Sequence, residues 1–198
     1  MAPAPRVDDA ALVRRALDGD RWAEEALYRR HVRRVSDVAI RVLGRAHEAE
    51  DVVQDTFLKA LQKLPTLRDP SLFERWLMRI AMNMVRGKLR KRKLLRTLGL
   101  DRSVDDATLE RMASPSTPPD VRAELAGIDA VLRDVTGEQR LAWMLHCVEG
   151  WSLPEVASTL GCSLATVKRR IRAARDRIEE HLEEPELLKA TWTAEDPR

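Results

Sequence analysis

Apolar residues recur at intervals of three and four along most of this chain, the period of an amphipathic helix. The first half predicts a short helix near residues 11–17, a second from Arg21 to Gly44, a third from about His47 to Leu64, and a fourth after Ser71. Apolar positions predicted on the second and fourth helices are Trp22, Ala26, Val32, Val35, Val38, Ala39, Val42, Phe73, Trp76, Leu77, Ile80, Ala81 and Met84. No strand pattern competes with these stripes, so an all-helical fold is expected.

Three segments carry the spacing of a capping box, in which two side chains satisfy free backbone amides at a helix start. They begin at Ser71, Thr136 and Ser152, each followed three residues later by Glu or Gln. The box at Thr136 opens a helix with buried positions predicted at Leu141, Met144, Leu145 and Val148. These signals place helix starts in both halves of the chain.

Between the halves the composition changes. Pro115, Pro118 and Pro119 interrupt any helix, and Ser, Thr and acidic residues surround them, as in a linker. We therefore expect two small helical domains joined by a flexible linker. The predicted units are a domain at 1–97, a linker at 98–120, a helix-turn-helix domain at 121–182 and an acidic tail at 183–198.

The helix-turn-helix prediction depends on specific positions. Ala157 is small where two helices must cross, Gly161 suits a turn that needs a positive φ, and Val167 closes a small core with Val156, Leu160 and Ile171. Ser163 then caps a second helix. Such a helix places its early exposed residues in the major groove of duplex DNA.

Charge adds a second contact with nucleic acid. The net charge is only +3, but Lys and Arg crowd into two helices. One is the second helix of the helix-turn-helix, with Lys168, Arg169, Arg170, Arg172, Arg175 and Arg177, and the other follows the Trp76 stripe, with Arg86, Lys88, Arg90, Lys91, Arg92, Lys93 and Arg96. Two cationic helices predict two separate contacts with nucleic acid.

Other chemistry is not indicated. Cys147 and Cys162 lack CxxC spacing, and no phosphate loop or nucleophile motif occurs, so no metal, cofactor or catalytic residue is expected and the protein is not expected to be an enzyme. The start of the chain has no apolar leader, and no run approaches eighteen apolar residues. A cytoplasmic protein without membrane insertion is expected.

Three motifs together carry a family resemblance. Residues 50–61 read EDVVQDTFLKAL, residues 73–83 read FERWLMRIAMN, and residues 150–175 read GWSLPEVASTLGCSLATVKRRIRAAR. In this order they resemble the two domains of an extracytoplasmic-function sigma factor, a small class of bacterial sigma factor, over most of the chain from Asp9 to Leu182. The resemblance implies a promoter-specificity subunit that binds core RNA polymerase and promoter DNA, often restrained by an anti-sigma factor.

The resemblance also implies roles for individual residues. Polymerase binding falls to one face of the third helix, at Asp51, Gln54, Asp55 and Leu58. Val52, Val53, Phe57 and Leu61 are expected to turn toward the core instead. Recognition and melting of the proximal promoter element fall to Arg68, Asp69, Ser71, Arg79, Asn83, Arg86, Lys88 and Arg90. Reading of the distal element as duplex falls to Ser163, Thr166, Lys168, Arg169, Arg172 and Arg175.

Two other readings stay open. A stand-alone helix-turn-helix regulator would bind duplex DNA tightly without polymerase. A nucleic-acid-processing enzyme would use Asp51 and Asp55 on a metal, although two acids on one helix lack further ligands. Binding by the purified protein separates the first reading from a sigma factor, and metal-dependent cleavage of DNA would support the second.

Overall fold

The computed structural model describes residues 8–100, 131 and 134–181, and every element in that part of the chain is a helix. The predicted tail, the helix start near Val121 and all but the first three residues of the predicted linker lie outside the described residues. The elements are α1 (Asp9–Leu17), α2 (Arg21–Leu43), α3 (Ala46–Lys63), the 3-10 turns η1 (Leu64–Thr66) and η2 (Pro70–Leu72), α4 (Phe73–Thr97), α6 (Gly137–Trp143), the π-helical turn η4 (Met144–Val148), α7 (Leu153–Leu160) and α8 (Leu164–His181). The all-helical prediction is confirmed.

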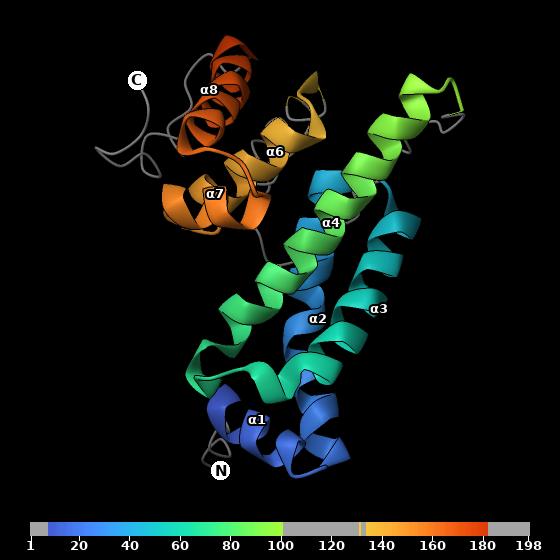
Figure 1. Ribbon diagram of the computed structural model, residues 1–198, viewed down its shortest axis with the longest axis vertical. Helices are drawn as coiled ribbons and strands as arrows, with labels where there is room; N and C mark the ends of the chain where they lie inside the picture. The colour runs from blue at the N-terminus through green and yellow to red at the C-terminus, as the bar shows by residue number, and fades with distance from the viewer. Residues whose placement is uncertain (1–7, 101–130, 132–133, 182–198) are drawn as a thin grey trace, which may run out of the picture.

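Helices α2, α3 and α4 run side by side along the long axis, and α1 packs across one end of them (Figure 1). The period of three and four brings one stripe of each helix into a shared core. Buried α2 positions are Ala23, Leu27, His31, Val35, Val38, Ala39, Val42 and Leu43. Gly44 then ends α2 at φ +68°, and its amide donates to the Ile40 carbonyl at 2.7 Å. A residue with a side chain would be strained at this φ.

Helices α6, α7 and α8 form the second cluster, beside the C-terminal half of α4 (Figure 1). The capping boxes at Thr136 and Ser152 are confirmed, and Gly161 takes the left-handed conformation at φ +55° in the turn before α8. The core of this second cluster includes Leu141, Leu145, Val156, Leu160, Val167, Ile171 and Ile178. The helix-turn-helix prediction is confirmed in these details.

Several predicted positions were wrong. Trp22 is 55% exposed and stacks with the Arg15 guanidinium, 4.8 Å from the ring centre, and Val148 is 47% exposed. The capping box at Ser71 does not form, because α4 begins at Phe73. The Asp69 carboxylate instead accepts a hydrogen bond from the Ser71 amide. On α4 the stripe also includes Met78, Met82 and Val85, while Trp76, Ile80 and Met84 are only partly buried.

The two clusters contact each other through charged side chains. Arg140 of α6 is buried and donates to the main-chain carbonyls of Arg41 and Val42, at 3.3 and 3.2 Å, at the end of α2. Arg34 of α2 pairs with Glu149 at 2.6 Å. Because helix C-terminal carbonyls lack partners within their own helix, a guanidinium from the other cluster satisfies them.

Candidate nucleic-acid and partner interfaces

The outward face of α3 carries the four residues predicted to bind polymerase, Asp51, Gln54, Asp55 and Leu58, and all four are exposed. Their spacing of three and four residues places them on one side of the helix. Val52, Val53 and Phe57 on the opposite side are buried, as expected. The face is therefore acidic and polar with an apolar end at Leu58, whose side chain is 54% exposed.

Leu61 was predicted to turn toward the core, but it is 39% exposed. It follows Leu58 by three residues and Gln54 by seven, so it extends the outward face. The helical spacing itself carried this signal. Two exposed leucines beside carboxylates give the face apolar area that a protein partner can cover.

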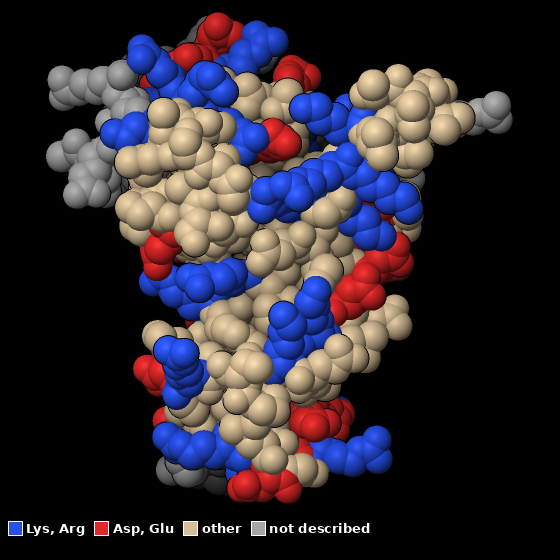
Figure 2. Space-filling model, in the orientation of Figure 1, with Lys and Arg blue, Asp and Glu red and all other residues tan. Residues whose placement is uncertain are grey.

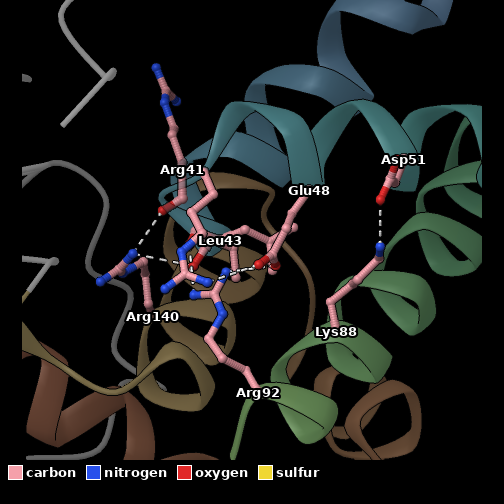
Figure 3. Close-up of polar contacts among 9 residues, drawn as sticks. Arg41, Leu43, Glu48, Asp51, Lys88, Arg92 and Arg140 are labelled. Carbon is pink, nitrogen blue, oxygen red and sulfur yellow. Dashed lines mark hydrogen bonds and ion pairs between the residues drawn. The ribbon is translucent and has the colours of Figure 1, made fainter. Parts of the chain in front are cut away.

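Asp51 already has a partner within the chain. The Lys88 ammonium donates to its carboxylate at 2.8 Å, from α4 to α3 (Figure 3). This hydrogen bond lowers the pKa of Asp51. Lys88 therefore lies on the α3 side of α4, apart from the other residues predicted at the proximal promoter element.

The remaining α4 residues of that set share one face. Arg79, Asn83, Arg86 and Arg90 follow each other at intervals of four, three and four, and only Arg86 is half-buried while the others are exposed. A face of guanidinium and amide groups can bind phosphates and hydrogen-bond bases.

The loop before α4 is shaped by its own polar groups. The Asp69 carboxylate accepts hydrogen bonds from the Ser71 hydroxyl at 2.7 Å and the Ser71 amide at 2.9 Å. Both hydrogen bonds lower the pKa of Asp69, the one from the hydroxyl more than the one from the amide. These two residues hold the turn, whereas Arg68 is exposed beside it.

Two other α4 cations are used inside the protein. Arg86 donates to the Thr159 carbonyl of α7 at 3.3 Å. Arg92 donates to the Leu43 carbonyl at 2.9 Å and to Glu48 at 2.7 Å (Figure 3). Some cations of the basic run on α4 therefore stabilise the fold, a role that the sequence pattern did not reveal.

Glu48 is the acceptor at the centre of this cluster, since Arg45 also donates to it, at 3.0 Å. Burial acts to raise the pKa of Glu48, but the hydrogen bonds from Arg92 and Arg45 outweigh burial and leave the pKa below its usual value of 4.5. The carboxylate is therefore stabilised in its charged form.

Helix α8 presents its cations differently. Lys168, Arg169 and Arg172 are exposed, and Figure 2 shows Lys and Arg side chains gathered over this helix and over the C-terminal half of α4. Arg175 pairs with Glu179 at 3.0 Å. Arg170 turns inward to pair with Glu138, a role that the count of basic residues could not reveal.

Ser163 and Thr166 stabilise the start of α8. The Thr166 amide donates to the Ser163 hydroxyl oxygen at 3.2 Å, and the two hydroxyls lie 2.9 Å apart. This is the predicted cap. Because both side chains are already bonded to each other, they fix the geometry from which Lys168 and Arg169 project.

Within residues 8–100 and 134–181, no three His, Cys, Asp or Glu side chains gather to hold a metal ion. No helix in the described part of the chain is both long and apolar enough to cross a membrane.

Comparison with known proteins decides the family. A family model for sigma-70 region 2 matches residues 27–94, and one for sigma-70 region 4 matches residues 126–178. The RNA polymerase sigma factor NccH of Alcaligenes xylosoxydans xylosoxydans is 34% identical over 175 residues, which cover 88% of this chain and 94% of NccH. The ECF RNA polymerase sigma factor SigM of Mycobacterium tuberculosis is 31% identical over 170 residues, covering 86% of this chain and 82% of SigM. The chain belongs to the extracytoplasmic-function sigma factors.

A solved structure agrees with this assignment. The sigma factor RpoE of Bartonella quintana, in complex with the anti-sigma factor NepR, superposes with a TM-score of 0.62 at 26% identity, over 78% of this chain and 92% of RpoE. As a sigma factor, the protein is a promoter-specificity subunit that binds core RNA polymerase and promoter DNA and directs initiation. A regulator that acts without polymerase is not favoured.

Proposed function

We propose that the outward face of α3 is the surface by which this sigma factor docks on core RNA polymerase. The support is the division of α3 into an exposed face with Asp51, Gln54, Asp55 and Leu58, and a buried face that holds the bundle. Leu61 extends the docking face. Since the exposed side chains contribute little to the core, they are available to a partner.

We propose further that the loop at Arg68 and the α4 face opposite Lys88 contact the proximal promoter element. Extruding a base from duplex DNA costs a few kcal/mol, so hydrogen-bonding and stacking groups must offset the lost pairing. Arg79 and Asn83 are exposed and close in register for that role. Helix α8 is proposed to enter the major groove at the distal element through Lys168 and Arg169, with Arg172 and Arg175 on phosphates.

Charge reversal tests the docking face. Replacing Asp51→Arg together with Asp55→Arg should abolish pull-down of core polymerase while circular dichroism stays unchanged, because both side chains are exposed. Glu25→Arg is the control, since Glu25 is an exposed acid on α2, outside the proposed face. Unchanged pull-down by the double variant, or equal loss with Glu25→Arg, would refute the docking face.

Run-off transcription tests the promoter role as a whole. Core polymerase with this chain should initiate on a subset of genomic fragments, and the shared upstream sequence gives the promoter. Tight sequence-specific binding by the chain alone, without initiation, would favour the stand-alone regulator instead.

We propose that the protein works in the cytoplasm, where its polymerase partner is, that it is not an enzyme, and that an anti-sigma protein restrains it. The support for the last point is the complex of the similar sigma factor RpoE with NepR. A true anti-sigma protein should block pull-down of core polymerase by this chain. A candidate that binds but leaves pull-down intact would not be the restraining partner.

A further inference from the structure

A cavity of about 150 Å³ lies where α4 meets α6 and the turn before α8. Its walls come from both halves of the protein. Arg86 and Arg90 project from α4, Glu138 from α6 and Arg170 from α8, and Gly161 and Leu160 form the side toward the turn. Such a cavity exists only while the two halves are packed together.

The charges around this cavity do not balance. Three guanidinium groups and one carboxylate line it, an excess of two positive charges. The single carboxylate, Glu138, is already paired with Arg170. Arg86 donates to the neutral Thr159 carbonyl. Within the described part of the chain neither Arg86 nor Arg90 forms an ion pair, and Arg90 is exposed. Like charges held together repel each other, so the site favours an added anion.

The backbone allows the guanidinium of Arg86 to enter. A Cβ atom at Gly161 would lie 2.9 Å from Nη2 of Arg86, and Gly161 has φ +55°. The turn therefore leaves room for the guanidinium beside its main chain. Burial and repulsion by Arg90 and Arg170 lower the pKa of Arg86, and the opposing effect of Glu138 and Cys162 does not offset them.

We propose that this cavity binds the phosphate groups of a small polyphosphate, either free pyrophosphate or the diphosphate of a nucleotide. Guanidinium groups match phosphate oxygens with paired hydrogen bonds, and three of them at a cavity of this size suit a compact, multiply charged anion. Because the arginines come from both halves, the bound anion holds the halves together. Arg86 and Arg90 also belong to the proposed proximal-element surface, so the anion competes with promoter DNA.

Calorimetry on the full chain at constant ionic strength tests the site. Pyrophosphate should bind saturably with one site per chain, and Arg90→Gln should weaken binding about tenfold, the effect of losing one charged hydrogen-bonding partner. Lys91→Gln is the control, because it removes an exposed cation from the adjacent position of α4 outside the cavity. The absence of saturable binding, or equal weakening in both variants, would overturn the proposal.

Further titrations identify the source of the phosphate. ADP binding as tightly as pyrophosphate, with AMP weaker, indicates a nucleotide diphosphate, whereas pyrophosphate alone indicates the free anion. Small-angle scattering should show a more compact chain with pyrophosphate than with sodium sulfate at equal ionic strength, and an unchanged scattering profile would refute the claim that the anion holds the halves together. These measurements need no polymerase, so their failure would leave the run-off test of promoter function untouched.

Discussion

Helices α4 and α8 both carry a dense run of Lys and Arg, yet the two runs are placed differently. On α4, Arg86, Lys88 and Arg92 donate to groups of α7, α3 and the end of α2. On α8, Lys168 and Arg169 point outward and make no ion pair within the described residues. Three cations of the α4 run therefore bond to neighbouring elements, whereas the cations at the start of the α8 run stay open to solvent.

The difference follows from position in the fold. Helix α4 belongs to the N-terminal bundle and also contacts α6 and α7 of the second cluster, so several of its cations face protein. Helix α8 packs on α6 and α7 by one stripe, and its other side faces solvent. A cation near buried carbonyls or carboxylates bonds to them, whereas a cation exposed to water stays available to a ligand. On the proposed proximal-element surface Arg86 is engaged with the Thr159 carbonyl, while Arg79, Asn83 and Arg90 are exposed.

The largest expected effect comes from removing a bonded cation of α4. Arg92→Ala deletes the donor to the Leu43 carbonyl and to Glu48, and leaves a partly buried carboxylate with Arg45 as its remaining partner. We expect the free energy of unfolding, measured with urea, to fall by about 2–3 kcal/mol. Arg169→Ala is the control on α8 and should change it by less than about 0.5 kcal/mol. Equal losses would erase the contrast between the helices.

The next effect concerns DNA and should fall on α8. Lys168→Ala and Arg169→Ala should each weaken holoenzyme binding to a duplex distal element by about 1–3 kcal/mol, the range for a lost base contact. Fluorescence anisotropy with labelled duplex measures this change. Because both side chains are exposed, thermal unfolding of the variants should match the parent. Full affinity in both variants would show that this face of α8 does not reach the bases.

A smaller effect sharpens the comparison within α8 itself. Glu179 pairs with Arg175, a residue proposed to bind phosphate, so Glu179→Gln should raise duplex affinity about two- to threefold at low salt. Glu180→Gln removes the same charge from the pair with Arg177, which is outside the proposed set. An equal gain from both variants would point to general charge instead of release of Arg175.

The smallest effect is a dependence on pH. The pKa of Glu48 is lower in the folded protein than its usual 4.5, so its contribution to stability is present above that value and is lost as pH falls through the folded pKa. The free energy of unfolding, measured with urea from pH 6 down to the acid range, should fall less with decreasing pH in Glu48→Gln than in the parent. An identical dependence of stability on pH in the variant would mean that Arg92 and Arg45 do not hold the Glu48 carboxylate in its charged form.

Local patterns predicted what local physics decides. Capping at Thr136 and Ser152, the left-handed Gly161 and the outward face of α3 all depend on residues within one or two helical turns, and each was confirmed. The prediction that Trp22 belongs to the core was wrong. An apolar residue in the first turn of a helix can stack on a nearby guanidinium instead of entering the core.

Distant contacts were beyond the sequence patterns. Arg92 and the Leu43 carbonyl are 49 residues apart, and Arg86 and the Thr159 carbonyl are 73 apart. A Lys or Arg run gives charge and spacing but not which main-chain group will meet each cation.

Several contacts between the halves have a main-chain carbonyl as acceptor, including the bonds from Arg140 to Arg41 and Val42 and from Arg86 to Thr159. A substitution at any of these three acceptor positions leaves the carbonyl oxygen in place. Sequence drift on the receiving side can therefore alter the surface without erasing the attachment. Loss of the attachment requires a change at the arginine or a shift of the receiving helix along its axis.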